Sequence, residues 1–511
     1  MIETDLLAEF WRDSQVAFPV WSWALSAVII LSLQIVGVRR GVSVGAVGLC
    51  LLGMIVYAIW SFDPALNESL YFGSVNWDPL AQSLNGLALV ISLGVYLMSL
   101  PGLFSDSKLF RLNYHQYPEF LTCLLLSGFG IAVAVSAVDL TSFFLGFEAL
   151  SIGTYAMCGF FRSQIRSTEA ALKYLFVGAF ATVVFLWGIA MLYGATGSTG
   201  YADIAATIAV GPEPLVLLAC IFITAGLAFK FALIPFHFYA PEVYDGAPTP
   251  VTAFMATAMK VAVVGAGIRL FWGVLGDLSH LWLPMWLALC VLSILVANVW
   301  ALQQRSLKKL FAFSSISHAG YIGLALLVAD PSGSEWPLFP VLSYITIYSL
   351  MSLGLFALVT WMENRDEVFL IEDLRAYARK NLGRSLLLAV FIAGMAGFPP
   401  FAGFVIKLMV FQALIAQGYV GVALLAVVGS IIGAIYYLRL LVSIFMSSEE
   451  SGAASGWSGM LDRLYSIRLV VGLTVLVTCI GGLFPNVFAD RIFGVLGRSS
   501  VNTEISRDSS E

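Results

Sequence analysis

The sequence predicts an all-α polytopic membrane protein with about fourteen transmembrane helices. Of its 511 residues, 60% are hydrophobic and only 11% are charged, and the mean hydropathy is +0.91. A soluble globular chain carries about 25% charged residues, so this composition cannot cover a surface that faces water. The hydrophobic stretches are continuous rather than alternating, which excludes a transmembrane β-barrel. Each is close to the roughly 20 apolar residues with which a helix crosses a bilayer.

The predicted spans are bounded by glycine, proline or charged residues. They fall at 17–38, 43–62, 80–101, 117–137, 139–161, 168–194, 214–239, 248–273, 281–302, 306–329, 337–362, 385–417, 419–446 and 466–489. The short interval around Asp139 is where two spans are most easily merged into one. The first span is not read as a secretory signal, because the chain starts with acidic residues rather than a basic region.

Cofactor and metal chemistry have no signature in this chain. The six cysteines occur singly in apolar stretches without a C-x-x-C pair, and we interpret them as packing residues. The glycine-rich segment 194–200 fits neither a dinucleotide fingerprint nor a P-loop. The net charge of −5 is weak and no basic run is present, so nucleic acid is not expected as a partner. We therefore expect no cofactor and no metal bound by this chain, and a lipid bilayer around it.

The distribution of lysine and arginine predicts the orientation. With the N-terminus outside, sixteen of the 26 basic residues fall in cytoplasmic connections, five fall in outer segments and five lie inside spans. Short cytoplasmic loops are enriched in basic residues, so both termini are predicted on the outer side. The segment from Glu363 to Arg384 carries ten charges among 22 residues, and we expect a solvated cytoplasmic connection there.

Six ionisable residues within the predicted spans are candidates for a functional site. They are Glu148, Lys173, Lys230, Lys260, Lys407 and Arg439. Lys173 and Arg439 lie near the cytoplasmic ends of their spans, where a long side chain reaches the interface, and Lys173 follows Glu169 by one helical turn. The other four lie near the middle of the bilayer, where each charge costs about 2.5–3.5 kcal/mol. Residues kept at such a cost indicate function.

Two interpretations of the deep charges stay open. As structural salt bridges they would only lock helices together, but one carboxylate cannot neutralise three lysines, and replacing buried ion pairs often stabilises a fold. As a proton relay they would use desolvation, which weakens the hold of a buried lysine on its proton. Glu148 would then control whether the first lysine keeps or passes its proton. His318, at mid-depth, is either a link between the halves of the relay or a neutral packed histidine.

Two spans are predicted to be broken helices. Pro235 follows Lys230 by five residues, and Pro399 and Pro400 precede Lys407 in an apolar stretch of some 33 residues. Proline frees backbone carbonyls, which a membrane tolerates only against protein or a water-filled cavity. A lysine beside a break in each half suggests two inverted five-helix repeats. The predicted divisions are 1–116 for helices 1–3, 117–273 for the first repeat, 274–447 for the second repeat, and 448–511 for a C-terminal loop, the last helix and a polar tail.

The segment from Ala225 to Phe254 contains the string FKFALIPFHFYAPEVYDGAPTP. It resembles the signature of the antiporter-like subunits of respiratory complex I, and the resemblance extends over about residues 75–490. The part VYDGAPTP, together with EAALKY at 169–174, is most similar to the subunit N group, also called subunit 2. A lysine at position 407 favours the same group, because subunit M typically has a glutamate there. Subunit L typically carries a C-terminal extension with a long lateral helix, whereas this chain stops about twenty residues after its last span.

The resemblance implies a proton-translocating subunit of NADH:quinone oxidoreductase in the bacterial inner membrane. Glu148 matches the family's glutamate on the fifth helix, Lys230 the lysine of the broken seventh, Lys260 that of the eighth and Lys407 that of the broken twelfth. The implied route runs from the cytoplasm near Lys230 through Lys260, and through His318 if it takes part, to Lys407 and outward. NADH, FMN, iron–sulfur clusters and quinone are expected in other subunits. The expected partners are subunit M, the small subunit K and the lateral helix of subunit L.

Two other classes of protein remain as alternatives. An Mrp-type cation/proton antiporter subunit would use the same lysines and would transport Na⁺ without NADH oxidation. A scaffold subunit would use the charges only to fix helix contacts, and alanine at Lys230 would then leave proton pumping intact in an assembled complex.

Overall fold

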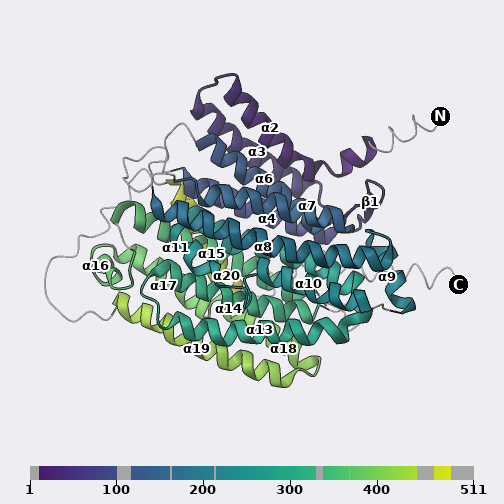
Figure 1. The fold of residues 1–511 in the computed structure, drawn as a ribbon. Coiled ribbons are helices and arrows are strands. Elements are labelled where there is room, and N and C mark those ends of the chain that lie inside the picture. The colour runs from purple at the N-terminus through teal and green to yellow at the C-terminus, as the bar shows by residue number, and fades with distance from the viewer. Residues whose placement is uncertain are drawn as a thin grey trace.

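The helices of this chain lie side by side along a common direction (Figure 1). The structure is a computed structural model, and it describes residues 11–100, 117–161, 164–211, 214–329, 338–366, 369–445 and 465–484. Its α-helices are α2 (Phe18–Ile35), α3 (Arg40–Trp60), α4 (Pro79–Ser99), α6 (Tyr117–Ser136), α7 (Leu140–Cys158), α8 (Ile165–Thr196), α9 (Tyr201–Val210), α10 (Pro214–Lys230), α11 (Tyr239–Gly246), α12 (Thr249–Gly267), α13 (Ser279–Ala301), α14 (Leu307–Leu327), α15 (Phe339–Asp366), α16 (Asp373–Lys380), α17 (Leu382–Ala396), α18 (Ala402–Ala416), α19 (Val420–Phe445) and α20 (Tyr465–Leu483).

The described chain also has two short strands and two short helical turns. The strands β1 (Glu68–Leu70) and β2 (Val75–Trp77) form an antiparallel hairpin. A π-helical turn, η2 (Ile268–Val274), continues α12, and a 3₁₀ turn, η3 (Gly276–Leu278), leads into α13. Eleven of the described helices are long and apolar enough to cross a bilayer, so the predicted all-α, multi-pass class is confirmed. The number of fourteen crossings stays a prediction, because α10, α17 and α18 are shorter.

The starts and ends of several helices follow from local sequence. Asp78 accepts a hydrogen bond from the Ala81 amide at 2.8 Å, which caps the first turn of α4. Asp139 caps α7 in the same way, with the Thr141 amide at 2.7 Å. The two spans on either side of Asp139 are therefore separate helices. Gly197, with a φ of 72°, ends α8 in a left-handed conformation that glycine adopts without strain.

Each end of the bundle gathers connections that the predicted topology puts on one side of the membrane. At one end, Ser306 donates a hydrogen bond to Asp245 at 2.5 Å and forms a β-bridge with Leu370. These residues come from three predicted cytoplasmic connections. At the other end, Asp139 forms a β-bridge with Gly200, which joins two predicted outer connections. The helix directions therefore alternate in the predicted order for these connections.

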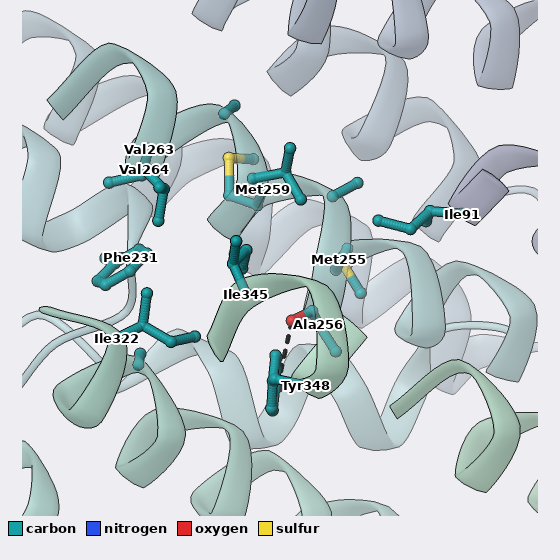
Figure 2. Packing of buried hydrophobic residues seen from close by; sticks show 14 of the residues in the cluster. Ile91, Phe231, Met255, Ala256, Met259, Val263, Val264, Ile322, Ile345 and Tyr348 are labelled. Atoms are coloured by element: carbon teal, nitrogen blue, oxygen red, sulfur yellow. Dashed lines mark hydrogen bonds between the residues drawn. The ribbon is translucent and has the colours of Figure 1, made fainter. Parts of the chain in front are cut away.

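Two helices, α12 and α14, lie inside the bundle. Every residue of α12 is buried, and so is every residue of α14 except Lys308 and Lys309 in its first turn. Helix α12 packs against α4, α6 and α15. Figure 2 shows Met255, Met259, Phe231 and Ile345 among the buried residues of this core. Side chains on α12 and α14 are therefore surrounded by protein, so a charged residue on either helix must find its partners within the chain.

The helix that carries Glu148 is held against its neighbour by a close backbone approach. A Cβ atom added to Gly146 of α7 would lie 2.6 Å from the Ala134 amide nitrogen of α6. On the same interface, a Cβ atom added to Gly130 would lie 2.4 Å from the Leu150 amide nitrogen. Larger side chains at these glycines would push the two helices apart. The position of α7 relative to α6 is thus fixed by this close approach.

The charged segment from Glu363 to Arg384 is less exposed than predicted. It contains the amphipathic helix α16, whose Leu374 and Tyr377 are buried. Glu363 is only 3% exposed, and the Arg384 guanidinium lies 4.3 Å from the centre of the Trp361 ring. The prediction of a solvated connection is wrong at Glu363, because this carboxylate is paired inside the protein.

Candidate functional site

Lys230 and Glu148 form the one deeply placed ion pair that the sequence predicted. Lys230 is the last residue of α10, and its Nζ lies 3.4 Å from Oε1 of Glu148. The same ammonium donates to Ser151 Oγ at 2.6 Å, and Thr182 Oγ1 donates to the same Oε1 at 2.8 Å. The Lys230 side chain is 4% exposed and that of Glu148 is 22% exposed. The carboxylate therefore reaches outward, while the lysine lies inside.

The chain breaks immediately after Lys230. Ala232 takes a φ of 58°, and the helix does not resume until α11. The freed Phe229 carbonyl accepts a hydrogen bond from the Tyr239 hydroxyl at 3.0 Å, and the Ile234 amide donates to Ser293 at 2.8 Å. Protein groups therefore satisfy the interrupted backbone, as a break at membrane depth requires.

Lys260 lies in the centre of the bundle without an acidic partner among the described residues. Its Nζ donates to the Ala256 carbonyl at 3.0 Å and to Ser315 Oγ at 2.7 Å. The Tyr348 hydroxyl bonds to Ser315 at 2.9 Å and donates to the Ala256 carbonyl at 3.2 Å, a contact drawn in Figure 2. The Tyr348 ring also lies 5.5 Å from the lysine nitrogen, a favourable position for a cation. Neutral groups alone hold this ammonium.

His318 lies near groups that contact Lys260 and Lys407. Its ring centre is 6.3 Å from that of Tyr321, and the Lys407 nitrogen lies 5.3 Å from the Tyr321 ring. His318 follows Ser315 by three residues on α14, and so lies on the same helix face. Its ring centre is 5.1 Å from that of Tyr348, and its Nδ1 lies 2.9 Å from the Tyr344 hydroxyl. The histidine is buried. The structure therefore brings His318 next to the residues that contact Lys260.

Lys407 lies on α18, and its ammonium turns back onto the end of α17. It donates to the carbonyls of Ala396 at 3.0 Å and Met395 at 3.3 Å, and to Ser430 Oγ at 3.2 Å. Backbone carbonyls at a helix C-terminus carry partial negative charge and favour a cation. Gly397, with a φ of 84°, leaves room there, because an added Cβ would lie 3.1 Å from Cδ of Lys407.

Two of the candidate residues lie apart from this buried line. The Lys173 side chain is 44% exposed and pairs with Glu169 at 2.7 Å and with Glu242 at 3.6 Å. The Lys309 ammonium, 2.6 Å from Glu242, lowers the pKa of that carboxyl. Arg439 donates to the backbone carbonyls that follow α13, at 2.6 and 3.0 Å. Both residues therefore have structural partners near the end of the bundle.

Sequence reasoning missed the hydroxyl groups that contact the charged residues. These are Ser151, Thr182, Ser315, Tyr344, Tyr348 and Ser430. Hydroxyl groups both donate and accept hydrogen bonds, so they suit a path that exchanges protons. Their one signal in the sequence was the run Ser315-Ile-Ser-His318, which places a serine and a histidine one turn apart.

The described part of the chain has no cluster of at least three His, Cys, Asp or Glu residues that could hold a metal ion. The six cysteines form no disulfides. The buried lysines and the interrupted helices are therefore the chemical features of this site.

A fold with lysines beside two helix breaks defines the class of antiporter-like membrane proteins. Residues 137–433 match the family described as "NADH:quinone oxidoreductase/Mrp antiporter, TM". The NADH-quinone oxidoreductase subunit N of Laribacter hongkongensis is 34% identical over 468 residues, which are 91% of this chain and 93% of that protein. The chain belongs to the NADH-quinone oxidoreductase subunit N family, which confirms the resemblance found in the segment from Ala225 to Phe254.

Two solved structures have a similar fold. A chain of respiratory complex I from Thermus thermophilus with bound aureothin is 30% identical, with a TM-score of 0.74, and the match covers 93% of this chain and 99% of that one. A chain of the Mrp complex from Dietzia sp. DQ12-45-1b has a TM-score of 0.78 at 19% identity, covering 96% and 97%. The second likeness establishes a common fold and no more.

Proposed function

We propose that this chain translocates protons as a membrane subunit of NADH:quinone oxidoreductase. The observation that carries the proposal is a line of buried lysines, each held by a different kind of partner, on helices at the centre of the bundle. The reaction belongs to the translocase class. NADH, FMN, iron–sulfur clusters and quinone belong to other subunits, and this chain contributes no redox site.

In this proposal the contact between Glu148 and Lys230 is the control point. An ionised carboxylate at 3.4 Å stabilises the ammonium, so Lys230 keeps its proton while the contact lasts. Protonation of Glu148, or a movement of α7 relative to α10, weakens the contact and lets the proton leave. Redox work elsewhere in the complex reaches this chain as that change.

The proton then passes through Lys260 and His318 to Lys407. Ser315 and Tyr348 supply hydroxyls beside Lys260, and each can accept one proton while donating another. Lys407 is the last carrier before the outer side. The break between α17 and α18 admits the water that takes up its proton.

We place the chain in the bacterial inner membrane with both termini on the periplasmic side. Its two repeats are 117–273 and 274–447, and each has a lysine beside a break. Its partners are subunit M, the small subunit K and the lateral helix of subunit L. The Arg375→Cys variant tests the orientation, because position 375 is exposed on α16. Labelling there by an impermeant thiol reagent from the periplasmic side of intact cells would refute the topology.

A second candidate function is that of an Mrp-type cation/proton antiporter subunit. The matched family covers both kinds of protein. Affinity purification from membranes separates them: an NADH-oxidising assembly supports the first function, and small antiporter subunits with Na⁺ transport support the second.

The Lys230→Ala variant tests the relay itself. Purified complex in proteoliposomes is expected to assemble normally and to pump protons poorly during NADH oxidation. If an assembled Lys230→Ala complex pumps like the wild type, the lysine serves only to hold helices together and the relay proposal fails.

A further inference from the structure

A polar cavity of about 860 Å³ opens at the end of the bundle that carries the predicted cytoplasmic connections. It lies where the start of α8, the junction of α11 and α12, the connection between α13 and α14, and the end of α15 meet. Its charged lining residues are Arg166, Asp245, Arg305, Lys308, Lys309 and Glu363. Neither Glu148 nor Lys230 lines this cavity, so the relay described above gives it no role.

Glu363 is the more deeply buried of the two carboxylates in the lining. The Thr249 hydroxyl donates a short hydrogen bond to Oε2, and Lys308 Nζ lies 3.7 Å from Oε1. Lys308 also donates to the Ala247 carbonyl at 2.9 Å. Burying a carboxylate requires such partners, because its lost hydration is not otherwise replaced. Glu363 thus borders a space that water can fill, and yet is itself shielded from bulk solvent.

An aromatic pair, Phe311 of α14 and Phe356 of α15, lies on the inner side of this carboxylate. Phe311 follows Lys308 by one helical turn, and Phe356 precedes Glu363 by two turns. Both rings are buried, and they meet edge to face with their centres 6.2 Å apart. The pair therefore forms an apolar layer between the charged lining of the cavity and the middle of the bundle.

Polar groups resume beyond the aromatic pair. Ser315 lies one turn further along α14, and its hydroxyl accepts a hydrogen bond from Lys260 Nζ at 2.7 Å. Tyr348, two turns further along α15, bonds to Ser315. The aromatic pair therefore lies between the charged lining of the cavity and the polar groups around Lys260.

We propose that Glu363 takes up protons from the cavity for delivery to Lys260, with Lys308 as its counter-charge and the aromatic pair as a closed barrier. The proposal rests on the proton-translocating function argued above and adds to it a second uptake site. Water in the cavity gives a proton to the Glu363 carboxylate, and the neutral acid loses its attraction to Lys308. When the rings part, the proton passes along water and the Ser315 hydroxyl to a neutral Lys260 amine.

The Glu363→Gln variant tests this role in the intact complex. Glutamine has almost the same shape and still accepts the Thr249 hydrogen bond, but it cannot carry a proton. Proton pumping by proteoliposomes is expected to fall at least about fivefold, which is less than the roughly 10²–10⁴-fold typical of a lost proton-transferring group because uptake near Lys230 remains. Glu363→Asp, which keeps the acid, is expected to retain more pumping than Glu363→Gln. The matched control is Glu242→Gln, which removes an exposed carboxylate paired with Lys309 at the same end of the bundle and is expected to pump normally.

The outcomes separate this inference from the proposed function. Normal pumping by Glu363→Gln beside an impaired Lys260→Ala complex overturns the uptake site and leaves the relay intact. Normal pumping by both variants overturns the relay as well. If the Glu363→Gln complex does not assemble, the Phe356→Ala variant tests the uptake site instead. Opening the aromatic layer is expected to lower the number of protons pumped per NADH. An unchanged ratio in that variant overturns the inference.

Discussion

Arginine in place of Lys407 distinguishes a proton carrier from a fixed positive charge. The guanidinium keeps the charge and has donors for the carbonyls of Ala396 and Met395, which now lie 3.0 and 3.3 Å from the lysine nitrogen. Arginine holds its proton with a pKa above about 12, so at neutral pH only about one molecule in 10⁵ is neutral. A relay step through position 407 is therefore slowed by orders of magnitude, and we expect pumping below about 5% of wild type.

The larger size of the guanidinium could by itself impair the Lys407→Arg variant, and the structure allows this steric effect to be bounded. The lysine side chain runs past Gly397, where an added Cβ would lie 3.1 to 3.5 Å from its last three atoms. Extra bulk in such a packed place costs about 1–3 kcal/mol, which lowers stability without in itself stopping proton transfer. Thermal unfolding of the purified complex measures this cost separately from pumping.

The assay compares Lys407→Arg with Lys407→Ala in proteoliposomes, with a pH-sensitive dye for pumping and native electrophoresis for assembly. Alanine leaves two buried carbonyls without this donor, which costs about 1–3 kcal/mol for each group left unsatisfied. If the lysine supplies only charge, arginine works nearly as well as wild type and alanine damages assembly. An assembled Lys407→Arg complex that pumps normally removes Lys407 from the proton path.

Variants at four further positions test the remaining parts of the site. Glu148→Ala is expected to reduce pumping in an assembled complex, and Glu148→Asp to reduce it less, because a carboxylate still influences Lys230; equal activities in dye-quench assays contradict the control point. Lys260→Ala is expected to lower pumping while native gels show normal assembly, since Ser315 and Tyr348 still bond to each other; wild-type pumping excludes this lysine as a carrier. Lys173→Gln breaks exposed ion pairs, which contribute about 0–1 kcal/mol, so pumping and melting temperature should hardly change, and a large loss of pumping places Lys173 in the relay. Gly397→Ala forces a left-handed alanine, at about 1–2 kcal/mol, and a lower melting temperature should follow; an unchanged one shows that the turn relaxes.

The charged residues of the site were predictable because they stand out within long apolar stretches of the sequence. A lysine within about twenty apolar residues is conspicuous in any sequence, and so is a proline five residues after Lys230. The broken helices were found for the same reason, since Pro235 and the pair Pro399 and Pro400 cannot donate the hydrogen bonds of a continuous helix. Each of these signals lies within a few neighbouring residues, and the structure has helix breaks at both places.

The partners of those residues were not predictable, because they are ordinary residues brought together by packing. Ser315 and Tyr348 lie on two different helices from Lys260, and serine and tyrosine are common in any membrane helix. Glu363 was assigned to a solvated segment because charges crowd around it in sequence. Its burial depends on Thr249 and Lys308, which approach from two other helices, and composition in a window cannot report such contacts.

The two lysines beside the helix breaks differ in what holds them, and this limits how each can be adjusted. Lys230 faces a carboxylate, whose charge disappears on protonation, so the strength of this contact can change without any movement of the helices. Lys407 faces the carbonyls of α17, which do not titrate, so its hold changes only when α17 and α18 move apart. A single substitution of the acid can change how strongly the first ammonium is held, whereas changing this for the second requires a different backbone geometry. In the proposed path, the outer lysine is therefore released by a change in helix geometry, and the inner lysine by a change in the charge of Glu148.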